Sequence, residues 1–165
     1  MGSDSSPLRF DQLVKRHRHL PHWQLGGAVY FITFRSARGE LPSQARRQVI
    51  ENMLFDHGRR YDLHFGVVMH DHAHAALQPL EISPGVYHDL SRILNSLKGV
   101  SARRVNQLLG TSGKVWQEES FDRIIRNDFE YDEKMQYMWD NPVRAGLVER
   151  SEDYEFFVWP PDAPR

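Results

Sequence analysis

Residues 62–78 read DLHFGVVMHDHAHAALQ, with two apolar runs on either side of a short polar turn at His70-Asp71. Two such runs flanking a polar turn are typical of an antiparallel pair of strands. Within the second run, His72 and His74 are two positions apart, so their side chains point to the same face of the strand. The stretch therefore predicts a β-hairpin that presents two imidazoles on one face.

Segments on both sides of this hairpin alternate between strand and helix patterns. Aromatic and β-branched residues predict strands over 28–35 and 116–126. Apolar residues at helical spacing predict helices over 42–60, 87–109 and 129–139. Asn141-Pro142 is expected to interrupt the last helix. The order β-α-β-β-α-β-α predicts an α+β fold of the ferredoxin-like (split βαβ) type, an antiparallel sheet with helices on one face and an appended C-terminal helix.

Length and composition limit the class of protein. The chain has 165 residues, 40% of them hydrophobic, so residues 1–165 are expected to form one domain, with loose ends at about 1–10 and 160–165. The sequence contains no apolar run of about 18–20 residues and no secretory signal pattern, which favours a cytoplasmic protein without a membrane partner. Because there is no cysteine, disulfides, thiolate nucleophiles and cysteine zinc sites are excluded.

Charge is distributed unevenly along the chain. The net charge of −1 is not that of a typical nucleic-acid-binding domain, yet basic residues collect in 7–38 and 84–110 while acidic residues collect in 118–133. The basic stretches are candidates for contacts with phosphates, and the alternative is that they are solvated helix faces. The residues proposed to contact DNA are Lys15, Arg16, Arg18, Lys98, Arg103 and Arg104.

The paired histidines are the first candidate for chemistry. Neutral imidazole is a common metal ligand, and two on a rigid strand need only a further oxygen donor and water to hold a divalent ion. The alternative is a pair of exposed or merely hydrogen-bonded histidines. His70 is expected in the turn and is not assigned as a ligand.

Tyr137 and Asn141 are the second candidate, because two side chains four positions apart on a helix lie on the same side of it. Asn141 could instead cap a short turn beginning at Pro142. Tyr137 could equally be a core aromatic, and spacing alone does not select it among the six tyrosines.

The chain resembles the REP-associated tyrosine transposases, a branch of the single-tyrosine transposases of the HUH nuclease superfamily. The resemblance runs through about residues 19–150 in the family order and is most specific in the closing block Tyr-x-x-x-Asn-Pro-Val-x-Ala-Gly. The stretches that carry it are 19–24, 28–35, 67–74, 94–99, 115–126 and 137–148. The sequence departs from the family at His70-Asp71, where a proline followed by a polar residue is common, and in its low isoelectric point.

The resemblance implies roles for individual residues. His72 and His74 match the family's metal-binding pair, Tyr137 matches its nucleophile, and Asn141 matches a polar position that helps to complete the metal shell. The implied activity is a metal-dependent endonuclease and strand transferase on single-stranded or hairpin DNA, working through a 5′-phosphotyrosine. Both a monomer and a homodimer are compatible with it.

The chemistry is consistent with that implication. A phenol is almost fully protonated at neutral pH, so it needs a group that offsets the developing charge, and a divalent ion can do so. Two neutral imidazoles completed by oxygen donors favour Mg²⁺ or Mn²⁺, although such pairs also accept Zn²⁺. Two other functions stay open, a non-catalytic nucleic-acid-binding domain of the same plan and a metal-dependent hydrolase without a covalent step.

Overall fold

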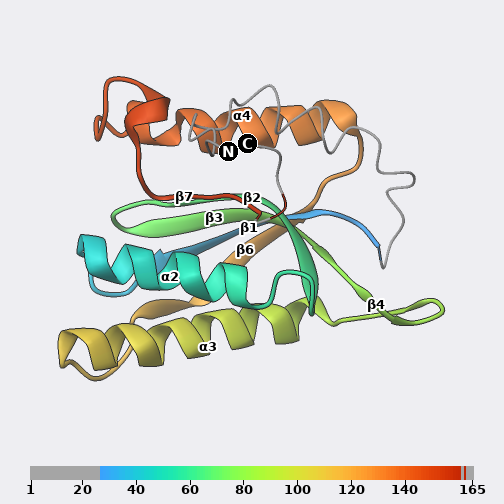
Figure 1. The fold of residues 1–165 in the computed structure, drawn as a ribbon, viewed down its shortest axis with the longest axis horizontal. Helices are drawn as coiled ribbons and strands as arrows, with labels where there is room; N and C mark the ends of the chain where they lie inside the picture. Colours follow the sequence, from blue (N-terminus) through green and yellow to red (C-terminus); the bar gives the residue numbers. More distant parts are fainter. Residues whose placement is uncertain (1–26, 161, 163–165) are drawn as a thin grey trace, which may run out of the picture.

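Five antiparallel strands form the central sheet in the order β6-β1-β3-β2-β7 (Figure 1). The computed structural model describes residues 27–160 and 162. The strands of this sheet are β1 (Tyr30–Ser36), β2 (Tyr61–Val68), β3 (His72–Pro79), β6 (Trp116–Ile124) and β7 (Phe157–Val158). The predicted ferredoxin-like α+β fold is confirmed, with β7 added at one edge of the sheet.

Helices cover both faces of the sheet. α2 (Ser43–Phe55) and α3 (Leu90–Leu109) lie together on one face, and α4 (Asp128–Arg144) lies on the other (Figure 1). The last helix is thus the appended C-terminal helix that the sequence predicts, and it forms a layer of its own. None of the helices in the described part of the chain is both long and apolar enough to cross a membrane.

Side-chain caps explain where α3 and α4 begin. The Asp89 carboxylate accepts a hydrogen bond from the Arg92 N–H at 2.9 Å, and the Asn127 side chain accepts one from the Glu130 N–H at 2.9 Å. These bonds satisfy N–H groups that have no partner within the helix. α3 ends at Gly110, whose φ of 64° is the left-handed conformation that glycine adopts without steric cost.

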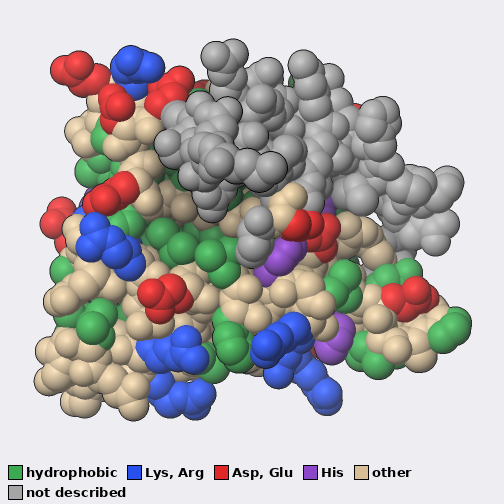
Figure 2. All heavy atoms as spheres, viewed as in Figure 1, with side chains coloured by type: hydrophobic (Ala, Val, Ile, Leu, Met, Phe, Trp, Pro, Cys, Tyr) green, Lys and Arg blue, Asp and Glu red, His purple; other side chains and the backbone are tan. Residues whose placement is uncertain are grey.

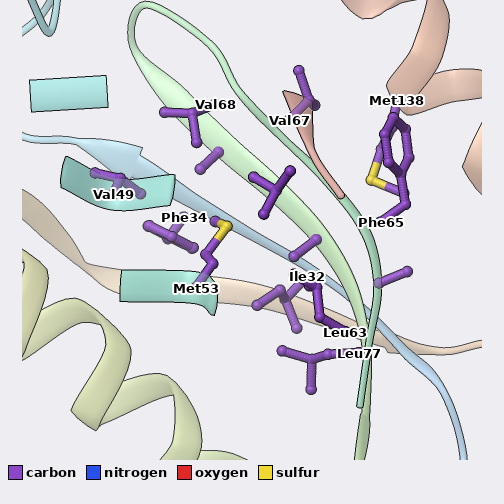
Figure 3. Close-up of a cluster of buried hydrophobic side chains, with 14 of the residues drawn as sticks. Ile32, Phe34, Val49, Met53, Leu63, Phe65, Val67, Val68, Leu77 and Met138 are labelled. Atoms are coloured by element: carbon purple, nitrogen blue, oxygen red, sulfur yellow. The ribbon is translucent and has the colours of Figure 1, made fainter. Parts of the chain in front are cut away.

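Both faces of the sheet carry an apolar core. On the side of the helix pair, Phe34 of β1 packs with Val49 and Met53 of α2, and on the other side Phe65 of β2 lies beside Met138 of α4 (Figure 3). All five side chains are almost completely buried. Burial of a side chain of this size contributes about 1.5–3 kcal/mol, so α4 is held on the sheet by its own part of the core.

The structure differs from the sequence prediction in several places. α4 continues through Asn141 and Pro142 to Arg144, so the predicted interruption and the cap at Asn141 are wrong. Pro142 has no backbone N–H to donate within the helix, and it is buried against the rest of the molecule. The structure also contains elements that were not predicted, namely the hairpin β4 (Glu81–Ser83) and β5 (Val86–Tyr87), the 3₁₀ turn η1 (Ser151–Asp153), and β7.

A buried hydrogen bond between Trp116 and Ser101 joins β6 to α3. The Trp116 indole N–H donates to the Ser101 hydroxyl at 2.8 Å. Ser101→Ala leaves that donor unpaired, so we expect a loss of about 1–3 kcal/mol in the free energy of unfolding, measured in urea. The control is Ser83→Ala on exposed β4, where a change within about 0.5 kcal/mol is expected. Equal effects of the two substitutions would contradict this assignment.

Candidate active site

His72 and His74 share one face of β3, the central strand of the sheet. Their ring centroids are 4.7 Å apart and their planes are nearly perpendicular. In the antiparallel register His72 lies opposite Arg35 and His74 opposite Thr33, both on β1. The His74 side chain is buried, whereas His72, at the first residue of the strand, is partly exposed. The rigid centre of the sheet therefore holds the two imidazoles together.

Each imidazole is fixed through its Nδ1 atom. The Asp71 carboxylate lies 2.6 Å from His72 Nδ1, and the Thr33 hydroxyl lies 2.7 Å from His74 Nδ1. In the tautomer whose Nδ1–H donates in these contacts, the Nε2 lone pair of each ring is available to a ligand. His74 Nε2 is buried and has no hydrogen-bond partner among the described residues. A buried polar atom without a partner is rare in a folded protein, so this nitrogen is suited to bind a metal ion.

Electrostatics keep His74 in the neutral form that a metal ligand requires. Burial, followed by the nearby charges of His72, Arg35 and Lys134, lowers the pKa of His74 to about 3. Burial alone would raise the pKa of Asp71, but its hydrogen bond with His72 and the surrounding positive groups lower it overall. At neutral pH His74 is therefore neutral and Asp71 is ionised, which are the states that a metal ligand and its orienting carboxylate require.

Tyr137 reaches the same place from α4. Its ring centroid is 5.4 Å from that of His74 and 6.1 Å from that of Phe31, both with edge-on geometry. Two cations flank the tyrosine ring, Lys134 Nζ at 5.9 Å and the Arg144 guanidinium at 5.5 Å from its centroid. The Tyr137 side chain is 37% exposed, so it is not a core aromatic. The structure thus brings a tyrosine, an imidazole pair and two cations together.

A groove of about 640 Å³ opens beside His74, Lys134 and Tyr137, whereas His72 and Arg144 are not among the described residues that line it. It is formed by the face of β1 and β3, one flank of α4 and the edge strand β6, and the residues that line it include Phe31, Arg35, His74, Phe121, Lys134 and Tyr137. α4 buries Tyr131, Met135 and Met138 against the sheet and packs on β2 and β3. α4 therefore does not cover the half of the sheet face over β1 and β6.

The remaining residue predicted to hold the metal does not line the groove. Asn141 is buried on α4, four residues after Tyr137, and among the described residues it does not line the groove. No cluster of three or more His, Asp or Glu side chains with metal-binding geometry occurs in residues 27–160 and 162. The imidazole pair fits a divalent ion, and the rest of its shell would have to come from neutral oxygen donors, water or substrate.

The predicted phosphate-binding residues of α3 lie on the opposite side of the sheet from Tyr137. Figure 2 shows Lys and Arg side chains gathered over the region of α2 and α3. Arg103 is exposed, Lys98 donates to the Glu118 carbonyl at 2.8 Å, and the Arg104 guanidinium lies 5.8 Å from the Phe55 ring centroid. Lys15, Arg16 and Arg18 lie outside the described residues, as do the predicted loose end at 1–10 and most of that at 160–165.

The sequence prediction missed several residues around the tyrosine. Lys134 precedes Tyr137 by three residues, a helical spacing that places both on one side and that could have been used. Thr33 and Arg35 are two positions apart on β1, so their side chains are expected on the same face of the strand. Their pairing with His74 and His72 depends on the strand register, which the sequence does not give.

Comparisons with known proteins support the fold. No family model and no curated protein matches this chain. Among solved structures, a REP-associated tyrosine transposase bound to a REP hairpin matches with 23% sequence identity and a TM-score of 0.63, over 84% of this chain and 81% of that one. A putative transposase from Deinococcus radiodurans matches with 16% identity and a TM-score of 0.48, over 72% and 93%. The chain therefore has the fold of the REP-associated tyrosine transposase, as the sequence resemblance led us to expect.

Proposed function

We propose that this protein is a transposase, a metal-dependent endonuclease and strand transferase that acts on single-stranded or hairpin DNA. The observation that carries the proposal is the position of the Tyr137 ring, 5.4 Å from the His74 ring in an accessible groove. The shared fold supports it, because the solved structure was determined with a REP hairpin bound. Both a monomer and a homodimer are compatible with this activity.

In this proposal His72 and His74 hold a divalent ion, Mg²⁺ or Mn²⁺, through their Nε2 atoms. When bound, the ion acts as a Lewis acid that polarises the scissile phosphate and offsets its charge. Asp71 and Thr33 hold the two rings in orientation through Nδ1. We retain Asn141 as the candidate oxygen donor, because its spacing on the uninterrupted helix places it one turn after Tyr137.

Tyr137 is the proposed nucleophile. Its phenolic oxygen attacks the phosphorus, a new bond forms between them, and the bond from phosphorus to the 3′-oxygen of the preceding nucleotide breaks. The phenolic proton passes to solvent, and the leaving oxygen takes up a proton to become a 3′-hydroxyl. Lys134 and Arg144, which flank the ring, attract the phosphate and favour the charge that builds up during attack.

The covalent step also accounts for strand transfer. The phosphotyrosine bond retains the reactivity of the phosphodiester, so a second 3′-hydroxyl can attack it, displace the phenol and rejoin the strand. No nucleotide cofactor is required for that exchange. A hydrolase that activates water would have no use for Tyr137 at this position.

The polarity of cleavage tests the proposal. Hairpin DNA with a single-stranded flank is labelled at either its 5′ or its 3′ end and incubated with the protein and Mn²⁺. Since the tyrosine captures the 5′-phosphate, only label that lies 3′ of the cut should migrate with the protein on a denaturing gel. Label from the other end on the protein, or cleavage without any adduct, would contradict the proposal.

Asp71→Asn tests whether Asp71 orients His72. The amide keeps the shape of the side chain but removes the charge that holds Nδ1, so we expect Mn²⁺ affinity to fall by about 10- to 100-fold in isothermal titration calorimetry. The control is Asp122→Asn, an exposed carboxylate on β6 that should leave the affinity unchanged. Equal dissociation constants for the Asp71 variant and the wild type would contradict this role.

The basic residues of α3 are tested through the dependence of binding on salt. For single-stranded DNA, each lost phosphate contact should reduce the slope of the logarithm of the binding constant against the logarithm of the salt concentration by about 0.7. We expect this reduction for Arg103→Gln, since the Arg103 side chain is exposed, and a corresponding one for Lys15, Arg16, Arg18, Lys98 and Arg104. Arg150→Gln, exposed beyond α4, is the control. An unaltered slope in the Arg103 variant would identify the α3 surface as merely solvated.

A further inference from the structure

Phe121 is an exposed aromatic residue on the edge strand β6. Its side chain is 57% exposed, although an aromatic ring of this size gains free energy by leaving water. The neighbouring positions on the same strand face, Glu119 and Arg123, are charged, as is common at the edge of a sheet. A large apolar ring among charged neighbours on an open edge points to a binding contact rather than to folding.

The strand register places Phe121 beside the candidate active site. Thr33 of β1 pairs with Phe121 on one side and with His74 on the other, so the three residues form one row across the sheet. Adjacent strands are about 4.8 Å apart, which puts the Phe121 and His74 backbones about 10 Å from each other. Phe121, His74 and Tyr137 line the same groove. A nucleotide whose phosphate lies beside Tyr137 can therefore extend its base towards Phe121.

The charges of the groove suit a single strand of nucleic acid. Arg35 and Lys134 also line it, against one carboxylate, that of Glu119, so two cations outweigh one anion. Lys134 Nζ lies 5.1 Å from the Phe31 ring centroid. Proteins that bind single strands combine cations that follow the backbone with aromatic rings on which bases stack. Phe31 is buried and packs against His74, so it is not available for stacking. Phe121 is the aromatic ring in the groove that is both exposed and outside the imidazole–tyrosine cluster.

We propose that Phe121 stacks against the base of the nucleotide that flanks the phosphate bound at Tyr137. This inference rests on the proposed function, since it assumes that single-stranded DNA occupies the groove. The contact would contribute affinity without strong sequence preference, because every base has an aromatic face. It would also hold the attached phosphate in register with the tyrosine.

Binding in EDTA tests the stacking contact separately from cleavage. Two labelled probes of equal length are compared by fluorescence anisotropy, an oligodeoxyadenylate of about 15 nucleotides and an abasic strand with the same phosphates. For the wild type, the adenylate should bind more tightly than the abasic strand. In Phe121→Ala we expect this preference to fall by about 5- to 100-fold, with the affinity for the abasic strand unchanged. Phe121→Tyr should retain the preference.

The matched control is Phe129→Ala, because Phe129 is also an exposed phenylalanine, on α4, and does not line the groove. It should behave as the wild type. The inference is overturned if the wild type shows no preference for bases, if Phe121→Ala keeps the preference, or if it weakens both probes equally. A missing phosphotyrosine adduct in the cleavage assay would instead count against the proposed function, and it leaves this binding comparison intact.

Discussion

Replacing Tyr137 by phenylalanine is expected to abolish the covalent protein–DNA adduct and to reduce cleavage on the order of 10⁴- to 10⁶-fold, the scale on which loss of a nucleophile acts. Only the hydroxyl is removed, so the ring keeps its edge contacts with His74 and Phe31. Binding of hairpin DNA and thermal stability should therefore stay close to those of the wild type. The measurement is a denaturing gel with DNA labelled 3′ of the cut.

The matched control for that substitution is Tyr87→Phe, a partly buried tyrosine outside the groove. It should form the adduct at the wild-type rate. The same pair of variants separates the three candidate functions. A hydrolase without a covalent step would keep cleaving after Tyr137→Phe, and a non-catalytic binding domain would show no cleavage in either protein.

Removing both imidazoles is expected to have the second largest effect. Without His72 and His74 the site loses the proposed cation, which is worth several kcal/mol in the transition state, so cleavage in Mn²⁺ should fall by about 10³-fold or more. Mn²⁺ binding measured by calorimetry should disappear as well, a readout that does not depend on activity. His70→Ala is the control, because His70 lies in the turn before β3.

Two results would contradict that assignment. The first is cleavage by the double variant at the wild-type rate, and the second is retained Mn²⁺ binding. A loss of activity that appears equally in His70→Ala would indicate damage to the hairpin rather than loss of ligands. Because His74 is buried, circular dichroism must accompany the assay to confirm that the variant is folded.

The strands and helices could largely be predicted from the sequence because most of them carry strong local patterns. The hairpin over 62–78 and the apolar stripe of α3 are examples, and both form close to their predicted bounds. α4 was predicted too short, since the local preference against helix before Pro142 is weaker than the burial of Asn141 and Pro142 against the rest of the molecule. β4, β5 and β7 are two or three residues long and carry no periodicity.

The candidate site could be predicted only in part, because it depends on which elements meet in space. Spacing gives the shared face of His72 and His74, and the resemblance singles out Tyr137. The packing of the layers decides that α4 lies across the sheet from α3. The strand register decides that Thr33 and Asp71 hydrogen-bond to the two imidazoles. For the same reason the sequence did not reveal that Lys98, Arg103 and Arg104 lie on the layer opposite Tyr137.

The central claim is that Tyr137 becomes covalently joined to DNA, and mass spectrometry of the adduct tests it most directly. After cleavage in Mn²⁺, the adduct is digested with nuclease and trypsin. Cleavage after Lys134 and Arg144 releases residues 135–144, a peptide in which Tyr137 is the only tyrosine. We predict that this peptide carries a 5′-phosphonucleotide on Tyr137. A nucleotide found on one of the other five tyrosines, or a peptide 135–144 that is never modified while DNA is cut, would contradict the account.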